Sequence, residues 1–375
     1  MTAALAASVG VDASQLKLAP LSNQVAGHPA GVQSLEDGKL VVKECLAQEL
    51  DFYHAVDRAA SESAGSPSKQ EHLLTRLSHF MPEFHGSWHD YLAAHHDGPP
   101  GANRDAAAEQ RRPPSPSRIV LENLTCSYDK ANVCDIKLGT QLYDDDASDE
   151  KRQRMQLASQ NTTSGMCGLR LTGWQVWDNQ TSTYHTVPKT FGKTVQAPDL
   201  ILGARMLLAS PKAGDAQRAE SILAGSSRVR VLPPPPADGD AIDAALVKDE
   251  SGLYLPELPP AAMRTLIEQS ILPALEQLVD IFSQLEIRMR GGSLLLVYEG
   301  SAEGLEQGLG PQPRTISTGR LPQRDGAKRL VDLRVIDFAH ATLVEGQGPD
   351  EGVLLGIRTT LQLFRSVLED LDGTR

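Results

Sequence analysis

The residues whose types and spacing best suit chemistry are Asp135 and Lys137, in the segment Asp-Ile-Lys-Leu-Gly that ends at Gly139. Alternate side chains of a β-strand share a face, so a strand here would project Asp135 and Lys137 together while its other residues pack against a core. A carboxylate beside an ammonium suits phosphoryl transfer: the first can hold a ribose hydroxyl or a metal ion, and the second can neutralise a moving phosphate. On spacing alone, an ordinary surface ion pair is the commoner explanation.

The residues before this segment indicate a small N-terminal sheet. Residues 31–43 have the pattern of a β-hairpin, with strands at 32–35 and 40–42 around Asp37-Gly38, a tight-turn dipeptide. Lys43 then ends the second strand, and residues 46–59 are predicted to be helical. Glu49 on that helix could pair with Lys43, as a helix glutamate pairs with a strand lysine in protein kinases. Without further motifs, a solvent-facing lysine is the commoner interpretation.

Further elements follow along the chain. Apolar patterning predicts strands at 119–124, 169–177, 183–187, 294–298 and 333–338, and helices at 149–159, 261–289 and 351–371. Pro273 should kink or divide the second of these helices. Three segments are rich in Pro, Gly or Ala. We expect disorder in residues 98–117 and 301–329, and a loop or linker in residues 228–240.

Asp337 closes an apolar strand, where an unpaired carboxylate would be costly to bury, so a cation is its natural partner. Two other metal or phosphate signals are weak. His85 and His89 are four residues apart, but Gly86 lies between them and no cysteine is near, so we do not expect a zinc site. The glycine-containing stretch 27–31 lacks a Walker lysine motif, which excludes a P-loop fold.

Four ordered motifs resemble the inositol polyphosphate kinase family, and together they extend over nearly the whole chain. They are Gln24–His28, the Asp-x-Lys-x-Gly signature from Asp135, Ser293–Gly300 and Arg334–His340. The basic segment Ser148–Arg154 also resembles the family's helix after the signature. One departure is Ala131, which stands where the family usually has a proline, four residues before the signature aspartate.

The resemblance implies an α+β, two-lobed, kinase-like fold with an antiparallel N-lobe sheet, a larger C-lobe and a small helical inositol-binding insert. We expect the N-lobe at 1–121, including the loop 98–117. The C-lobe is then expected at 122–375, with the inositol-binding insert at about 144–165 and the insertion at 301–329. A monomer is expected.

The resemblance also implies that ATP and Mg²⁺ bind between the lobes and that an inositol phosphate accepts the phosphoryl group. The implied catalytic residues are Lys137, Asp135 and Asp337, with Asp337 also as the metal ligand. The implied ATP-binding residues are Lys43, Glu122, Leu124 and Asp135; Glu122 and Leu124 belong to the hinge and act through their backbone. The implied inositol phosphate ligands are Lys137, Lys151, Arg154 and His340.

Within the family, the short insert and the segment Val297–Gly300 favour an inositol polyphosphate multikinase acting on inositol trisphosphate and tetrakisphosphate. Phosphoinositide lipid remains open as a further substrate. Inositol trisphosphate 3-kinase and inositol hexakisphosphate kinase remain alternatives, as does a scaffold for transcriptional or signalling proteins, with protein partners at the expected disordered insertions. The charged residues at 43, 135, 137 and 337 favour an enzyme, because a scaffold needs none of them.

Composition sets outer limits on these interpretations. A net charge of −12 argues against direct nucleic-acid binding and requires that a polyanionic substrate meet a local basic pocket. No apolar run approaches the roughly 18 residues that span a bilayer, and no secretory signal is predicted at the N-terminus. The four cysteines form no C-x-x-C pair, which favours reduced thiols inside the cell. The resemblance implies localisation to the nucleus and cytoplasm.

Overall fold

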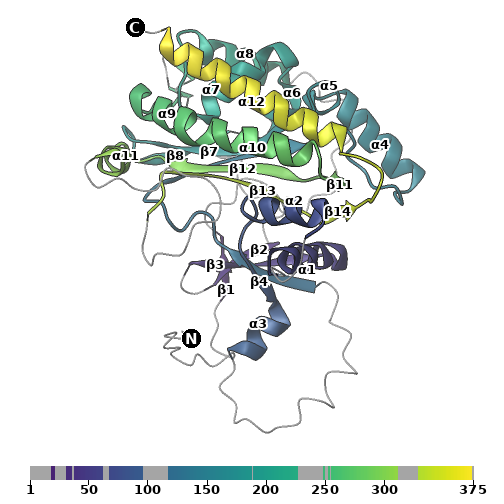
Figure 1. Cartoon of the computed structure of the whole chain (residues 1–375). Coiled ribbons are helices and arrows are strands. Elements are labelled where there is room, and N and C mark those ends of the chain that lie inside the picture. The colour runs from purple at the N-terminus through teal and green to yellow at the C-terminus, as the bar shows by residue number, and fades with distance from the viewer. Residues whose placement is uncertain are drawn as a thin grey trace, which may run out of the picture.

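A computed structural model describes residues 18–21, 31–35, 38–61, 67–95, 117–187, 189–226, 248–249, 252–253, 255–310 and 328–373. Two five-stranded antiparallel sheets dominate the fold, with the N-terminal sheet below the larger sheet and its helices (Figure 1). The predicted α+β architecture of two lobes, with an antiparallel N-terminal sheet, is confirmed. None of the described helices is both long and apolar enough to cross a membrane.

The N-terminal sheet has the strand order β1-β2-β3-β5-β4. Its strands are β1 (Leu18–Pro20), β2 (Val32–Leu35), β3 (Leu40–Cys45), β4 (Phe84–Ser87) and β5 (Ser117–Glu122). Helices α1 (Ala47–Ser61), α2 (Lys69–Ser78) and α3 (Trp88–Ala94) accompany it. The predicted hairpin is β2–β3, and Gly38 takes a φ of +72° in its turn, a conformation that glycine adopts without strain. The motif at 24–28 and the loop at 98–116 lie outside the described residues.

The larger sheet has the order β13-β12-β6-β7-β8, so β6 is its central strand. Its strands are β6 (Ala131–Leu138), β7 (Leu169–Asp178), β8 (Thr183–Val187), β12 (Ser293–Glu299) and β13 (Val331–Ile336). Two pairs of short strands stand apart from it: β9 (Lys248–Asp249) with β10 (Gly252–Leu253), and β11 (Ile287–Arg290) with β14 (His340–Leu343). The change of sheet therefore falls between Glu122 and Ala131.

Helices cover the face of the larger sheet that points away from the N-terminal sheet (Figure 1). The helices after β6 are α4 (Asp149–Gln160), α5 (Thr163–Cys167), α6 (Lys189–Thr194), α7 (Leu200–Leu207), α8 (Asp215–Ser226), α9 (Pro260–Leu266), α10 (Leu272–Phe282), α11 (Ala302–Leu309) and α12 (Glu351–Asp372). A 3₁₀ turn, Ala197–Asp199, precedes α7. The predicted insert at about 144–165 thus holds α4 and the start of α5.

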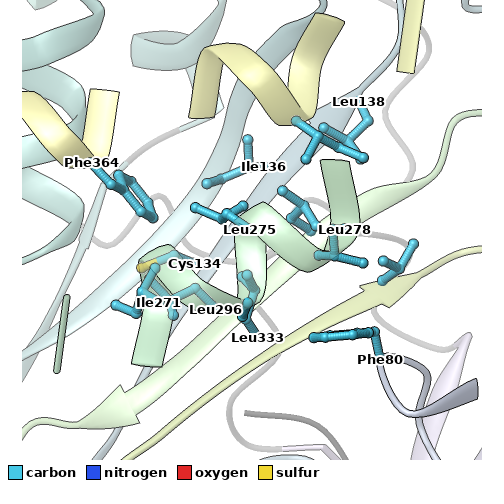
Figure 2. Close-up of a cluster of buried hydrophobic side chains, with 14 of the residues drawn as sticks. Phe80, Cys134, Ile136, Leu138, Ile271, Leu275, Leu278, Leu296, Leu333 and Phe364 are labelled. Atoms are coloured by element: carbon cyan, nitrogen blue, oxygen red, sulfur yellow. The ribbon is translucent and has the colours of Figure 1, made fainter. Parts of the chain in front are cut away.

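The main core lies between the sheet and α10 and α12, and it fixes which face of β6 is free for chemistry. Cys134, Ile136 and Leu138 of β6 point into this core, where they meet side chains of α10 and α12, among them Leu275, Leu278 and Phe364 (Figure 2). By alternation, Asp135 and Lys137 project from the opposite face, toward the N-terminal sheet. Burial of Cys134, Ile136 and Leu138 therefore fixes the orientation of β6, so that Asp135 and Lys137 face the N-terminal sheet together.

The helix predicted at 261–289 is divided and ends early. A π-helical turn, Ile267–Ile271, separates α9 from α10, and Pro273, which has no N–H to donate within a regular helix, is the second residue of α10. Helix α10 then ends at Phe282, and residues 287–290 form β11 instead. Ile287 and Met289 are both fully buried there because β11 pairs with β14, so the last part of the helix prediction was wrong.

Part of the expected disordered insertion at 301–329 is ordered. Helix α11 occupies Ala302–Leu309, with Ser301 as its N-cap: the hydroxyl accepts a hydrogen bond from the Gly304 amide at 3.1 Å. Leu305 is 1% exposed and anchors the helix to the main core. The expectation of disorder was wrong for residues 302–309, because one buried leucine and a cap outweigh a glycine-rich composition. Residues 311–327 lie outside the described residues.

Candidate active site

A cavity of about 470 Å³ opens between the two sheets. Strands β2, β3 and β5, helix α1 and the segment after β5 line one side of it, and β6, β12 and β13 line the other. Five of the nine predicted site residues line this cavity: Lys43, Glu122, Leu124, Asp135 and Asp337. Its remaining wall is largely apolar, as suits the planar ring system of a nucleotide base. The apolar lining includes Leu21, Val32, Val41, Leu121, Val133, Leu295 and Ile336.

Lys43 joins the two sides of the cavity. Its Nζ donates to Glu49 Oε1 at 2.7 Å and to Asp337 Oδ1 at 2.9 Å. The predicted pairing of Lys43 with Glu49 is therefore confirmed. Exposure differs sharply within the group, since the Glu49 side chain is fully buried, Lys43 is 18% exposed and Asp337 is 37% exposed. Asp337 is thus the member of this group that a ligand in the cavity can reach.

The charges of this group stabilise one another against burial. Burial disfavours the Lys43 ammonium, but the carboxylates of Asp337 and Glu49 more than offset it and raise the pKa of Lys43. Burial also disfavours the Asp337 carboxylate, yet Lys43 and Lys137 lower its pKa below the ordinary value. Glu49 keeps a raised pKa because burial outweighs the attraction of Lys43. Asp337 is therefore ionised and suited to bind a cation.

The backbone at Asp337 is held in an unusual conformation, with a φ of +65°. A non-glycine residue there carries strain that surrounding contacts must support. The next residue supplies them: the Phe338 amide donates to Glu49 Oε1 at 3.2 Å, and its ring stacks on Phe52 with centroids 4.8 Å apart. The turn that aims Asp337 into the cavity is thus anchored by α1.

Asp135 is held by a bulge between β6 and β7. The register shifts after Asp135, which leaves Thr172 unpaired in β7, and the Thr172 hydroxyl donates to Asp135 Oδ1 at 2.8 Å. Asp135 is 5% exposed, and this burial raises its pKa although the charge of Lys137 counteracts it. Lys137 is half-buried and lies near enough to act on the charges of both Asp135 and Asp337.

The two hinge residues line the cavity: Glu122 is the last residue of β5, and Leu124 lies in the segment that follows. The carboxylate of Glu122 is engaged elsewhere: its Oε2 lies 3.6 Å from the guanidinium of Arg334, which is fully buried, and it accepts a hydrogen bond from the Glu83 amide at 3.3 Å. Arg334 also donates to the Met81 carbonyl at 2.6 Å. These contacts fix the hinge. The Glu122 amide itself donates to the Glu83 carbonyl at 2.9 Å, so its N–H is not free for the nucleotide role that the resemblance implies.

Three of the four predicted inositol phosphate ligands, Lys151, Arg154 and His340, lie beyond the cavity, on α4 and at the start of β14. His340 Nδ1 lies 2.9 Å from Asp144 Oδ2, and the same oxygen lies 3.9 Å from Lys151 Nζ. The structure therefore brings Lys151 and His340 together through Asp144. Arg154 lies three residues after Lys151 on α4, with an exposed side chain, and is not part of this contact.

Two residues at this site were missed in the sequence. Asp144 looked like one member of an acidic run. Arg170 pairs across the sheet with Lys137, and its Nε is buried with no hydrogen-bond acceptor among the described residues. A guanidinium with an unused donor beside Lys137 is suited to bind phosphate. The available signal was its place between Leu169 and Leu171, which puts a charge on the outward face of a predicted strand.

The donor set fits Mg²⁺ bound together with a nucleotide. Mg²⁺ typically takes one or two protein carboxylates and completes its shell with phosphates and water, and Asp337 is the reachable carboxylate. Within the described ranges no cluster of three or more His, Cys, Asp or Glu could hold a metal ion by itself.

The fold and the site define a class: an α+β kinase in which a strand lysine, a helix glutamate and a strand-end aspartate meet in a cavity between two lobes. Comparison with known proteins then identifies the particular family. The family model described as inositol polyphosphate kinase matches residues 118–225 and 239–365, which is more than half of the chain. The chain belongs to the inositol polyphosphate kinase family and is therefore a phosphotransferase.

Two multikinases are among the most similar proteins. The inositol polyphosphate multikinase of Saccharomyces cerevisiae is 26% identical over 92% of this chain and 97% of its own length, and that of Schizosaccharomyces pombe is 33% identical over 50% of this chain and 62% of its own. Inositol hexakisphosphate kinase 3 of Mus musculus is 25% identical over 67% of this chain and 51% of its own length.

A solved structure shares the fold. The crystal structure of inositol phosphate multikinase Ipk2 from S. cerevisiae, in complex with ADP and Mn²⁺, superposes with a TM-score of 0.57. The match covers 88% of this chain and 99% of that chain, at 24% identity. The arrangement of the two lobes is therefore that of a known inositol phosphate kinase.

Proposed function

We propose that this kinase is a multikinase that transfers the γ-phosphoryl group of ATP to hydroxyls of inositol trisphosphate and tetrakisphosphate. The observation that carries the proposal is the convergence of Lys43, Asp135 and Asp337 on one cavity. Similarity over nearly the full length of a yeast multikinase supports this activity over hexakisphosphate kinases, which match about half of their own length. ADP and Mn²⁺ in the yeast Ipk2 crystal support a nucleotide and a divalent metal here.

On the nucleotide side, this chain's residues bind the base and the ribose and neutralise the charge of the phosphates. The apolar wall and the hinge backbone hold the base, and the Asp135 carboxylate accepts a hydrogen bond from a ribose hydroxyl. Lys43, kept charged by Glu49 and Asp337, lies against the phosphates. Asp337 and the phosphates would hold Mg²⁺, which when bound withdraws charge from the phosphoryl group.

On the acceptor side, Lys137 neutralises the phosphoryl group in transit, while Lys151, Arg154, Arg170 and His340 hold the phosphates of the inositol. No side chain at the site is assigned the role of general base. Phosphoryl transfer passes through a loose transition state in which positioning and charge neutralisation dominate, so this set is sufficient.

The test is incubation of the purified protein with ATP, Mg²⁺ and, in turn, inositol tris-, tetrakis-, pentakis- and hexakisphosphate, followed by anion-exchange separation of the products. We expect conversion of the trisphosphate and tetrakisphosphate and none of the hexakisphosphate. Asp337→Asn serves as the inactive control. Conversion of the hexakisphosphate in preference to the other substrates would contradict the proposal.

A further inference from the structure

A carboxylate lies among the predicted inositol phosphate ligands, where an anion is unexpected. Asp144 Oδ2 faces both His340 Nδ1 at 2.9 Å and Lys151 Nζ at 3.9 Å. The Asp144 side chain is 19% exposed, so solvent screens its charge only in part. Two donors that would otherwise serve the phosphates of a substrate are thus shared with a fixed negative charge.

The position of Asp144 is built into the loop between β6 and α4. On one side, Gln141 Nε2 donates to the Tyr143 carbonyl at 3.0 Å. On the other, Arg152 of α4 donates to the Asp145 carbonyl at 3.0 Å, and its guanidinium lies 5.5 Å from the centre of the Tyr143 ring. The backbone on both sides of Asp144 is therefore held in place.

We propose that Asp144 determines substrate specificity by limiting the number of phosphates the inositol can carry, an inference that rests on the proposed function. An ionised carboxylate only accepts hydrogen bonds, so it can bind a free hydroxyl of the inositol ring. A phosphate in the same place would bring like charges together at short range, which is strongly unfavourable in a partly desolvated site. Substrates with a hydroxyl near Asp144 bind, and fully phosphorylated inositols are rejected.

The contact between Asp144 Oδ2 and His340 Nδ1 spans 2.9 Å. Substitution of Asp144 by asparagine keeps the size and shape of the side chain at this contact and removes its charge. Asp144→Asn therefore tests the electrostatic effect with little change in packing.

The control is Asp146→Asn, which makes the same charge change two residues away at an exposed position. Wild type and both variants are compared by calorimetric binding of inositol trisphosphate and inositol hexakisphosphate in the absence of ATP, and by kcat/KM for the whole substrate series. We expect Asp144→Asn to raise the affinity for the hexakisphosphate, relative to the trisphosphate, by about five- to tenfold, the worth of one partly screened like-charge contact. We expect Asp146→Asn to change this ratio less than twofold.

An unchanged ratio in Asp144→Asn, or an equal change in both variants, would overturn the inference. The binding measurement gives this ratio even if the wild type phosphorylates none of these substrates. Such a lack of turnover would refute the proposed function but not the role of Asp144. If the wild type phosphorylates the trisphosphate and tetrakisphosphate while the ratio stays constant, the proposed function stands and the role of Asp144 falls.

Discussion

Replacement of Lys43 by methionine would test whether the buried charge of Glu49 depends on it. Methionine preserves most of the apolar stem and removes the ammonium. Glu49 is fully buried and would then lack its counter-charge, while Asp337, at 37% exposed, can be solvated by water. Breaking a buried ion pair by removing one partner typically costs about 3–5 kcal/mol. At about 2–4 °C per kcal/mol, we expect the melting temperature to fall by roughly 10 °C at pH 8.

The loss should depend on pH with a definite sign. Lys43 lowers the pKa of Glu49 against the effect of burial, so its removal raises that pKa further above the value in the unfolded chain, about 4.3. A carboxyl group whose folded pKa is raised binds more protons when folded, so the free energy of unfolding falls as pH rises above the unfolded value. The penalty of Lys43→Met should therefore be smaller at pH 5 than at pH 8.

The assay is thermal unfolding without nucleotide, since a ligand of the folded state would mask the effect. The double variant Lys43→Met, Glu49→Gln removes both charges and keeps the shape of the acid, and it should recover at least half of the loss at pH 8. A single variant as stable as the wild type at pH 8, or a double variant less stable than the single one, would refute the view that Lys43 neutralises a buried Glu49 carboxylate.

Four further outcomes are expected. Asp337→Asn should abolish metal-dependent turnover in a kinase assay while changing the free energy of unfolding by less than about 1 kcal/mol, because the residue is partly exposed and asparagine tolerates its positive φ. Lys137→Ala should lower kcat, by an amount that corresponds to about 1.5–3 kcal/mol of lost transition-state stabilisation. The Lys151 side chain is 44% exposed, and Lys151→Ala should mainly raise KM for the inositol phosphate. If Lys151→Ala weakened ATP binding equally, the assignment of Lys151 to the acceptor would be contradicted. Leu305→Ala should destabilise the protein by about 2–4 kcal/mol in denaturant unfolding, and an unchanged midpoint would mean that α11 does not pack on the core.

Local patterns were sufficient for the elements that carry the nucleotide site. In β6, three apolar residues alternate with Asp135 and Lys137, so the strand and its two faces follow from a period of two. In β2–β3, the turn dipeptide sets the hairpin, and Lys43 and Glu49 are six residues apart across a short connection. A contact between residues this close in sequence can be predicted because the short connection between them can adopt only a few conformations.

The misses were decided by contacts distant in sequence. Leu285 and Met289 continue the spacing of the preceding helix, while Ile287 and Met289 alternate as in a strand, and only pairing with β14 selects the strand. Helix α11 depends on Leu305, which reaches a core that composition cannot reveal. Asp144 and His340 are far apart along the chain, so neither residue's pattern indicated the contact between them.

The charge distribution explains how an acidic protein can handle polyanions. The net charge is −12, yet the cations at the site are placed where carboxylates stabilise them: Lys43 between Glu49 and Asp337, and Lys137 near Asp135 and Asp337. A phosphate that reaches Lys43 and a cation that reaches Asp337 would replace an internal ion pair by two external ones, with no change in the balance of charge. The charges close to the cavity, rather than the net charge of the protein, therefore determine which ions the cavity binds. The same principle makes the unexpected carboxylate, Asp144, a limit on how much negative charge the acceptor can bring.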